Sequence, residues 1–244
     1  MTEPTQLILG HGYVAKHLGP RLEKQGATVA STSRTDPQFI TFDLEDPDSW
    51  ENVPTVKTTF WMFPAVPLDL VKEFISAYGE RLGQIITVGS TSGFLVNTDG
   101  ETVDEASPLD LTRDRVLGEE FLRSNGAMTV MASGIYGPQR DPLDWIAKGY
   151  VGKSDKLVNM IHVEDLCQFL LAARDNGKKG HLYIASDNNP QTWRVVIDKW
   201  ESNGWADAVP VKTTDKISKR VKSSASLSEL SVNLKYQDFA DRVL

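Results

Sequence analysis

The sequence contains a single cysteine, Cys167, among its 244 residues. One cysteine excludes an internal disulfide and any cysteine-based zinc cluster, and it suits a reducing compartment, so we expect a cytoplasmic protein. No uninterrupted apolar run reaches the ~18 residues of a membrane span, and residues 1–6 lack the basic start and apolar stretch of a secretory signal. We therefore expect neither secretion nor a membrane partner.

Positive charge is also scarce, with 26 Lys+Arg against 33 Asp+Glu and a formal net charge of −7. Because sequence-independent nucleic-acid binding relies on clustered cations, we expect no nucleic-acid partner. His11, His17 and His181 have no carboxylate or histidine at ligand spacing, so we expect no metal site. The remaining composition, 40% hydrophobic and 24% charged, is that of an ordinary globular protein.

Short apolar segments alternate with amphipathic ones along the chain. Strands are predicted at 7–9, 28–32, 39–42, 58–62, 84–88 and 128–131, and helices from Val14 to Gly26 and at 68–77, 113–124, 163–173 and 192–200. Pro20 lies inside the first helical pattern and is expected to kink or weaken that helix. The alternation is typical of a parallel sheet covered by helices on both faces, so we predict an α/β, doubly wound fold.

A glycine-rich turn follows the first predicted strand and opens the first predicted helix. Gly10 permits the turn, Gly12 lets the backbone approach a ligand, and Ala15 allows close packing of helix on strand. Backbone N–H groups at such a helix N-terminus receive a pyrophosphate, so a dinucleotide is the expected ligand. We accordingly predict a single domain over 1–244, in which 1–133 form a nucleotide-binding Rossmann core and 134–244 add mixed core elements and a small C-terminal substrate lobe.

The end of the second predicted strand suggests which dinucleotide binds. An acidic residue about twenty positions past the glycines would bond the ribose 2′-hydroxyl of NAD, but the segment there reads Ser31-Thr32-Ser33-Arg34. Ser33 and Arg34 suit a 2′-phosphate, which favours NADP over NAD, although Arg34 as an exposed loop residue is the alternative. Asp43 after the third strand either accepts from the adenine amino group or caps a helix beginning near Pro47.

Several short motifs occur in an order that resembles one protein family. They are Gly10-x-Gly12-x-x-Ala15, Asp43-Leu44, Ser90-Thr91-Ser92, Val103-Asp104-Glu105-x-Ser107-Pro108, Ser133-Gly134-Ile135-Tyr136-Gly137-Pro138 and Ile161-His162-Val163-Glu164-Asp165-Leu166. Over nearly its whole length the sequence resembles the atypical branch of the extended short-chain dehydrogenases/reductases, of the NAD-dependent epimerase/dehydratase type. The resemblance implies a nicotinamide cofactor and a small or sugar-like hydroxy or carbonyl substrate.

The resemblance also implies roles for individual residues. Further residues expected at the cofactor are Tyr13, Val14, Leu44, Phe63, Pro64 and Ser90. Thr91, with Ser92, takes the place of the Ser/Thr that bonds a substrate oxygen during hydride transfer, the alternative being a cap of a helix or turn.

The proton-donating Tyr-x-x-x-Lys pair of the family is missing. Leu111 stands at the tyrosine position and Arg115 at the lysine position. Leucine has no proton to give, and arginine stays charged near pH 7, although Arg115 still offers a contact for a ribose or a substrate carboxylate. Tyr136 is the closest remaining donor by position, with a packed aromatic as the alternative. His162 is the second such residue, with a structural hydrogen bond as its alternative.

Two hypotheses of different classes follow. The first is an NADP-linked oxidoreductase or epimerase, which the Ser90-Thr91-Ser92 cluster and the substrate lobe favour. The second is a module that binds NADP as a structural ligand or sensor without catalysis, which the missing Tyr-Lys pair favours. We lean towards the enzyme, because a sensor has no obvious use for a substrate lobe.

Overall fold

The computed structural model describes residues 3–241, which divide into two compact units assembled from separated segments. Unit 1 contains the chain up to Gly93 together with residues 109–131 and 169–183. Unit 2 contains residues 94–108, 132–168 and those from 184 onward. Residues 94–108 thus precede position 133 but belong to unit 2, and residues 169–183 follow it but belong to unit 1.

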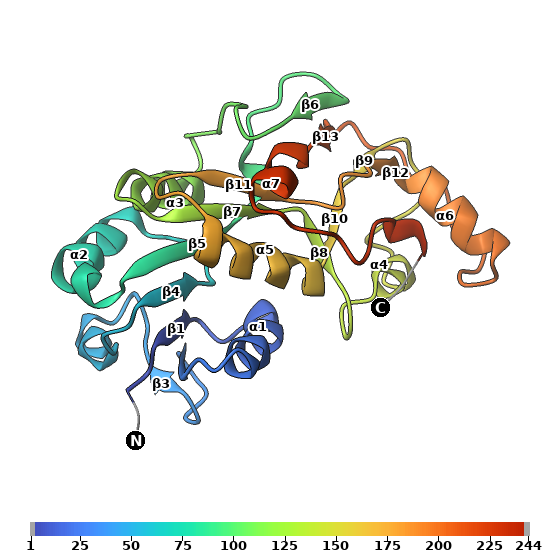
Figure 1. Ribbon diagram of the computed structural model, residues 1–244. Coiled ribbons are helices and arrows are strands. Elements are labelled where there is room, and N and C mark those ends of the chain that lie inside the picture. Colours follow the sequence, from blue (N-terminus) through green and yellow to red (C-terminus); the bar gives the residue numbers. More distant parts are fainter. Residues whose placement is uncertain (1–2, 242–244) are drawn as a thin grey trace. The chain divides into compact units, whose positions relative to one another are not determined.

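A seven-stranded sheet runs in the order β11-β7-β5-β4-β1-β2-β3 within the described residues (Figure 1). The strands are β1 (Gln6–Leu9), β2 (Val29–Ser33), β3 (Ile40–Thr41), β4 (Thr58–Trp61), β5 (Gln84–Ser90), β7 (Met128–Ala132) and β11 (Leu182–Ala185). The pairs β3–β2, β2–β1, β1–β4 and β4–β5 are all parallel. The predicted parallel sheet is confirmed, although the third strand is limited to two residues.

Helices cover both faces of this sheet, as predicted. The helices of unit 1 are α1 (Tyr13–Lys24), α2 (Leu68–Tyr78), α3 (Asp114–Ser124) and the later part of α5 (Val163–Asn176). Leu7 and Leu9 of β1 join an apolar cluster with α2 and α3, whereas Ile8 between them lies under α1. The later part of α5 lies next to the end of α1, since Arg174 Nη2 donates to Gln25 Oε1 at 2.9 Å. Helix α1 runs unbroken through Pro20, so the proline does not end the helix.

Unit 2 is built from short strand pairs and helices. The pairs are β8 (Gly134–Tyr136) with β10 (Met160–His162), β9 (Leu157–Val158) with β12 (Gln191–Thr192), and β6 (Glu101–Val103) with β13 (Lys219–Val221). Its helices are α4 (Pro142–Ala147), α6 (Trp193–Ser202) and α7 (Ser224–Glu229). Its core gathers Tyr136, Met160, Trp200 and Phe239 among others.

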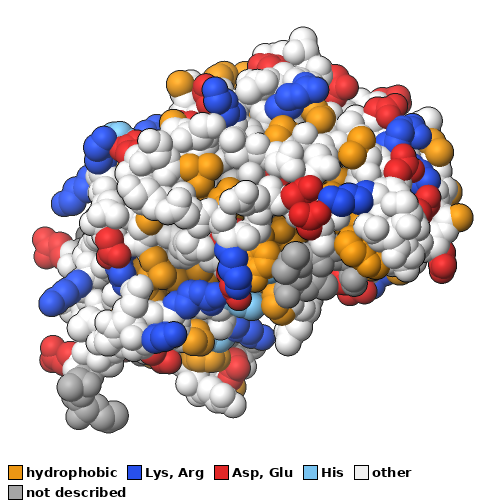
Figure 2. All heavy atoms as spheres, turned by 45° about the vertical axis from the view of Figure 1, so that its right-hand side comes forward, with side chains coloured by type: hydrophobic (Ala, Val, Ile, Leu, Met, Phe, Trp, Pro, Cys, Tyr) orange, Lys and Arg blue, Asp and Glu red, His pale blue; other side chains and the backbone are white. Residues whose placement is uncertain are grey.

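Charges of both signs are interspersed over the face seen in Figure 2. This distribution agrees with the mildly acidic composition and gives that face no broad basic surface. Among the residues from 3 to 241, no helix is long and apolar enough to cross a membrane.

Candidate functional site

The glycine-rich turn is tied to the end of β2. Gly10 N donates to Thr32 Oγ1 at 2.9 Å, and His11 N donates to the Thr32 carbonyl oxygen at 2.8 Å. Gly10 adopts a φ of +100°, which other residues rarely adopt. A Cβ at this position would also lie 2.9 Å from Phe63 Cδ1. The turn therefore needs glycine at position 10 both for its backbone conformation and for space.

Gly12 is glycine for a different reason. Its backbone is extended, with φ −95° and ψ −163°, so no left-handed conformation requires it. A Cβ added here would meet no atom within 4 Å. The protein thus leaves open space directly above the first turn of α1, where N–H groups are available to an anion. This opening fits a pyrophosphate.

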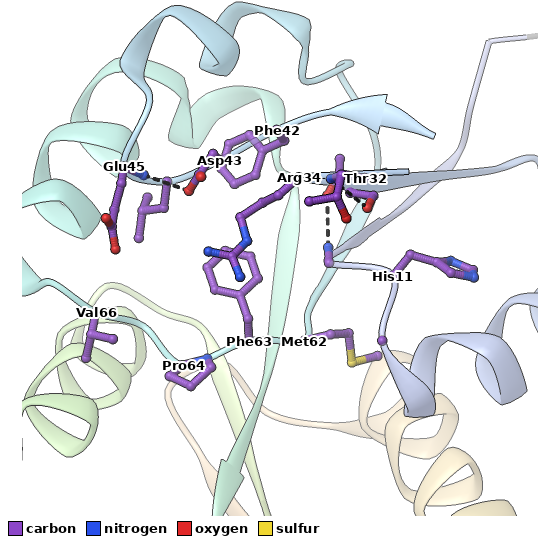
Figure 3. A pocket seen from close by; sticks show the side chains of 15 residues that line it. His11, Thr32, Arg34, Phe42, Asp43, Glu45, Met62, Phe63, Pro64 and Val66 are labelled. Atoms are coloured by element: carbon purple, nitrogen blue, oxygen red, sulfur yellow. Dashed lines mark hydrogen bonds between the residues drawn. The ribbon is translucent and has the colours of Figure 1, made fainter. Parts of the chain in front are cut away.

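A cavity of about 440 Å³ extends from the turn across the ends of β2 and β4 (Figure 3). Eight residues predicted at the cofactor line it, namely Gly10, Gly12, Ser33, Arg34, Asp43, Leu44, Phe63 and Pro64. In Figure 3 the Arg34 side chain extends from the end of β2 toward Phe63. A cavity of this size with apolar walls and few polar groups is typical of small-molecule sites.

The four other residues predicted at the cofactor do not line this cavity. Tyr13 packs edge-on against His17, with ring centroids 5.0 Å apart, and Val14 follows it in the first turn of α1. Ala15 is fully buried, which agrees with its expected packing role. Ser90 lies at the end of β5, where its hydroxyl oxygen accepts from Ser92 Oγ at 2.9 Å. Their part in cofactor binding stays a prediction.

The cavity also has lining residues that sequence reasoning missed. They are His11, Thr32, Thr35, Phe42, Glu45, Met62 and Val66. Thr32 is 1% exposed and carries the bond that fixes Gly10. The position of Thr32 at the end of the second predicted strand, beside Ser33, was the sequence signal that could have identified it as a lining residue.

The imidazole of His11 is fixed beside the turn. It stacks on Phe39 with ring centroids 3.9 Å apart and a 22° interplanar angle. Burial lowers the pKa of His11, Lys16 lowers it further, and Asp36 opposes them. The imidazole is therefore neutral near pH 7.

The loop after β2 carries no acidic group into the cavity. Ser33 Oγ accepts from the backbone N–H groups of Thr35 and Asp36 at 3.3 and 3.1 Å. Asp36 Oδ1 accepts from Gln38 N at 3.0 Å, and Asp36 is not among the lining residues. Arg34 is thus the charged group that this loop offers the ligand.

Asp43 does not cap the helical turn at Pro47–Asn52. Its Oδ1 accepts from Glu45 N at 3.1 Å, and the residue before Pro47, Asp46, occupies the cap position. The backbone of Asp43 is held by Ser49 and Trp50, which donate to its carbonyl oxygen at 3.0 and 3.1 Å. Because Asp43 lines the cavity, its role toward adenine stays open as a prediction.

The predicted catalytic residues of unit 1 follow β5. Thr91 is 7% exposed and starts a short helical turn, Thr91–Gly93, and Ser92 is exposed. Arg115 in α3 donates from Nε to Glu119 Oε1 at 2.5 Å and from Nη2 to the Val88 carbonyl oxygen at 3.0 Å. Leu111, which the resemblance places at the tyrosine position of the family, is 56% exposed, and that placement stays a prediction.

Tyr136, the donor predicted by position, belongs to the core of unit 2. It is 1% exposed and packs edge-on against His162 and Phe239, each at 5.0 Å between ring centroids. Burial raises the pKa of its phenol above the usual range, and the carboxylates of Asp187 and Asp165 raise it further. This geometry is that of the packed aromatic weighed as the alternative, and its part in proton transfer stays a prediction.

His162 has the structural role weighed as its alternative. It is fully buried and accepts from Glu164 N at 3.2 Å through Nδ1, at the start of α5. Its ring stacks on Tyr236 at 3.6 Å between centroids.

Comparisons with known proteins were made at the levels of family, curated sequence and structure. No family model matches the chain, and no curated protein matches it. Solved structures do match. One is a protein from Methylobacillus flagellatus assigned as an NAD-dependent epimerase/dehydratase, with 24% identity, a TM-score of 0.78 and coverage of 98% of this chain and 96% of that one.

Two further structures match at lower identity. A short-chain dehydrogenase/reductase superfamily protein from Agrobacterium tumefaciens with bound NAD has 12% identity, a TM-score of 0.78 and coverage of 97% and 94%. MoeE5 in complex with UDP-glucose and NAD has 15% identity, a TM-score of 0.74 and coverage of 95% and 93%. At these identities the likeness establishes the fold. The chain shares the Rossmann fold of these structures, as its α/β pattern predicted.

Proposed function

We propose that this protein binds NADP(H) in the cavity of unit 1 and acts as a reductase or epimerase on a small or sugar-like hydroxy or carbonyl compound. The observation that carries the proposal is the open space above Gly12 at the end of a 440 Å³ cavity lined by eight of the predicted cofactor residues. The solved structures with bound NAD lend support, because they share this fold.

The choice of NADP over NAD rests on the loop after β2. Arg34 is exposed at the cavity, and the nearby carboxylate of Asp36 is turned to Gln38 N. A guanidinium forms strong charge-assisted bonds to phosphate oxygens, whereas a free ribose is usually held by a carboxylate. The 2′-phosphate of NADP is therefore the better partner for this loop.

The chemistry is assigned to the end of β5. When bound, the nicotinamide supplies or accepts a hydride. Thr91 orients the substrate oxygen through its hydroxyl, with Ser92 beside it. The proton comes from water or from Tyr136, since Leu111 offers none. Without a positioned acid, which contributes typically 10²–10⁴ in rate, we expect modest turnover.

The second candidate function is a sensor that binds NADP without catalysis, and the exposed Leu111 in place of a tyrosine favours it. NADPH titration followed by NADPH oxidation against a panel of aldehydes, ketones and nucleotide sugars separates the two. We expect saturable binding together with slow turnover that falls at least tenfold in Thr91→Ala. Thr213→Ala, an exposed threonine of unit 2, is the matched control.

Three outcomes of this experiment are distinct. Tight NADPH binding with no oxidation of any compound would support the sensor. Turnover unchanged in Thr91→Ala would remove the threonine from the site. Absence of nucleotide binding would overturn both functions.

A further inference from the structure

Arg115 is held on two sides by groups of unit 1. One side is the carboxylate of Glu119, one helical turn along α3, and the other is the carbonyl oxygen of Val88 in β5. These bonds use two of the five N–H donors of the guanidinium, and the side chain stays 38% exposed. Arg115 therefore presents a fixed cation with donors to spare.

A buried glutamate is an unusual partner for Arg115, because burying a carboxylate costs free energy. It is 3% exposed, and a Cβ on Gly89 would lie 2.9 Å from its Oε2. Burial raises the pKa of Glu119, and the bond and charge of Arg115 oppose that rise. An apolar residue would join α3 to β5 without the desolvation cost of a carboxylate. What the carboxylate adds is a fixed direction for the guanidinium.

The guanidinium lies at the edge of the sheet where ligands bind. In open α/β sheets, ligands occupy the crevice outside the carboxyl ends of the strands. Val88 is near the carboxyl end of β5, and the Thr91–Gly93 turn follows that strand. A Cβ on Gly93 would lie 3.0 Å from Val116 Cγ2. The turn that begins with Thr91 therefore packs against α3 at the residue after Arg115.

We propose that Arg115 is the receptor for a substrate carboxylate and that Glu119 is its positioning residue. The substrate class is a 2-oxo acid or 2-hydroxy acid, in which the carboxylate lies next to the reacting carbon. A planar guanidinium matches a carboxylate with paired hydrogen bonds. Thr91 then holds the neighbouring oxygen, and the exposed Leu111 offers an apolar contact.

This inference rests on the proposed NADP(H)-dependent function. In the reductive direction, the carbonyl carbon gains a hydride from the reduced nicotinamide, the C=O π bond breaks, and the oxygen takes a proton from water. The products are a 2-hydroxy acid and the oxidised nucleotide, and the carboxylate bound to Arg115 is unchanged.

The test compares 2-oxobutanoate with its neutral amide, which differs only in the anionic group. For the parent protein we expect kcat/KM at least tenfold higher for the acid. Arg115→Gln should raise KM for the acid at least tenfold and leave the amide within twofold. Glu119→Gln should raise KM for the acid severalfold with little change in kcat. Arg113→Gln removes an exposed arginine that precedes α3 and pairs with Asp110, and it should change the kinetics of neither substrate.

A binding measurement accompanies the kinetics. Calorimetric titration of 2-oxobutanoate into the protein saturated with NADP⁺ should give binding that weakens at least tenfold in Arg115→Gln. If that variant does not fold, Arg115→Lys decides, since it keeps the charge but loses the planar fork and should still weaken binding.

Three outcomes overturn this inference. The parent protein has equal kcat/KM for the acid and the amide, 2-oxobutanoate does not bind, or the Arg115 variants still prefer the acid over the amide. Failure to bind NADPH at all overturns the proposed function instead. The NADPH affinity of each variant is therefore measured first and is expected to stay within twofold of the parent.

Discussion

The cavity of unit 1 and the core around Tyr136 in unit 2 use aromatic and charged groups in opposite ways. In unit 1, Phe63 and Arg34 line open space. In unit 2, Tyr136 is closed in by His162 and Phe239 at 1% exposure. A polar group can act on a ligand only where the fold leaves room beside it. The difference teaches that sequence position placed eight predicted cofactor residues beside open space and the predicted proton donor in a packed core.

The two units also differ in the partners of their buried carboxylic acids. Glu119 of unit 1 has Arg115 as its partner. Asp187 of unit 2 is 5% exposed and accepts from Asn189 N at 3.1 Å, and among residues 3–241 it forms no ion pair with a Lys or Arg side chain. Burial, with a smaller contribution from the carboxylate of Asp238, raises the pKa of Asp187 to about 7, and the backbone N–H of Asn189 opposes the rise. Unit 1 thus pairs its buried acid with a cation, whereas the buried acid of unit 2 has backbone N–H groups and no cation as partners among residues 3–241.

Filling the open space above Gly12 should have the largest effect, which is a loss of nucleotide affinity. Gly12→Val places a branched side chain where no protein atom lies within 4 Å, so the fold should persist while the pyrophosphate loses its place. We expect nucleotide affinity to fall at least a thousandfold, or about 4 kcal/mol. Fluorescence titration with NADPH measures the loss, and circular dichroism checks the fold.

Gly19→Ala is the control for this change. A Cβ at Gly19 would meet only Ile8 Cδ1 at 3.7 Å, which is an ordinary contact, and alanine suits a helix better than glycine. Nucleotide affinity should stay unchanged. Normal binding in Gly12→Val would place the phosphate site elsewhere.

Replacing the buried Asp187 of unit 2 should change how the free energy of unfolding depends on pH. Because the folded-state pKa of Asp187 is raised to about 7, the folded protein holds this proton more tightly than the unfolded chain. Its contribution to stability is therefore fully present below about pH 4, the ordinary aspartate pKa, and is lost as pH rises toward 7. Asp187→Asn stays neutral and should stabilise the protein by about 4 kcal/mol at pH 8 and by nearly nothing at pH 4.

Urea unfolding of both proteins at several pH values measures this difference. Asp207→Asn, at an exposed position of unit 2, is the control and should leave the pH profile unchanged. An equal effect of Asp187→Asn at pH 4 and pH 8 would show that Asp187 does not titrate between them.

The positive charge of Arg34 at the cavity of unit 1 should decide whether NADP(H) or NAD(H) binds more tightly. We expect NADP(H) to bind at least tenfold more tightly than NAD(H), or about 1.4 kcal/mol, because Arg34 faces the cavity. Arg34→Ala should remove this preference by weakening the binding of NADP(H) alone. Arg194→Ala, which removes a half-buried arginine of unit 2 paired with Asp155, should preserve it. Equal affinity of the parent protein for both nucleotides would overturn the assignment.

Local sequence patterns predicted the sheet and the cavity because the relevant signals are short-range. The run Leu7-Ile8-Leu9 is apolar on both faces of its strand, and the two glycines follow it directly. Thr32 was missed because its side chain acts on Gly10 through tertiary packing, and a threonine in a strand of small residues gives no sign of that bond. The role of Asp43 was left open, since an aspartate after a strand suits both a contact to the adenine amino group and a cap of the following helix.

Unit 2 was harder to predict for a physical reason. Its strands are two or three residues long and pair across distant segments, as β6 does with β13, so no single segment carries a strong period. The packing of Tyr136 depends on Phe239, which lies far from it in the sequence. The family motif left a proton donor and a packed aromatic open for Tyr136, and its packing against Phe239 was not visible from that motif.

Substitution of the buried tyrosine should have the smallest effect. A phenol whose pKa is raised by burial gives up its proton reluctantly, and its ring already has neighbours on two sides. Tyr136→Phe keeps the ring, so we expect kcat for NADPH oxidation to change less than about threefold, within the range expected when no general acid is lost. Tyr150→Phe, at a tyrosine that is 75% exposed, is the control. A fall of a hundredfold or more in Tyr136→Phe alone, with NADPH affinity unchanged, would instead make Tyr136 the proton donor and would require its core to open during turnover.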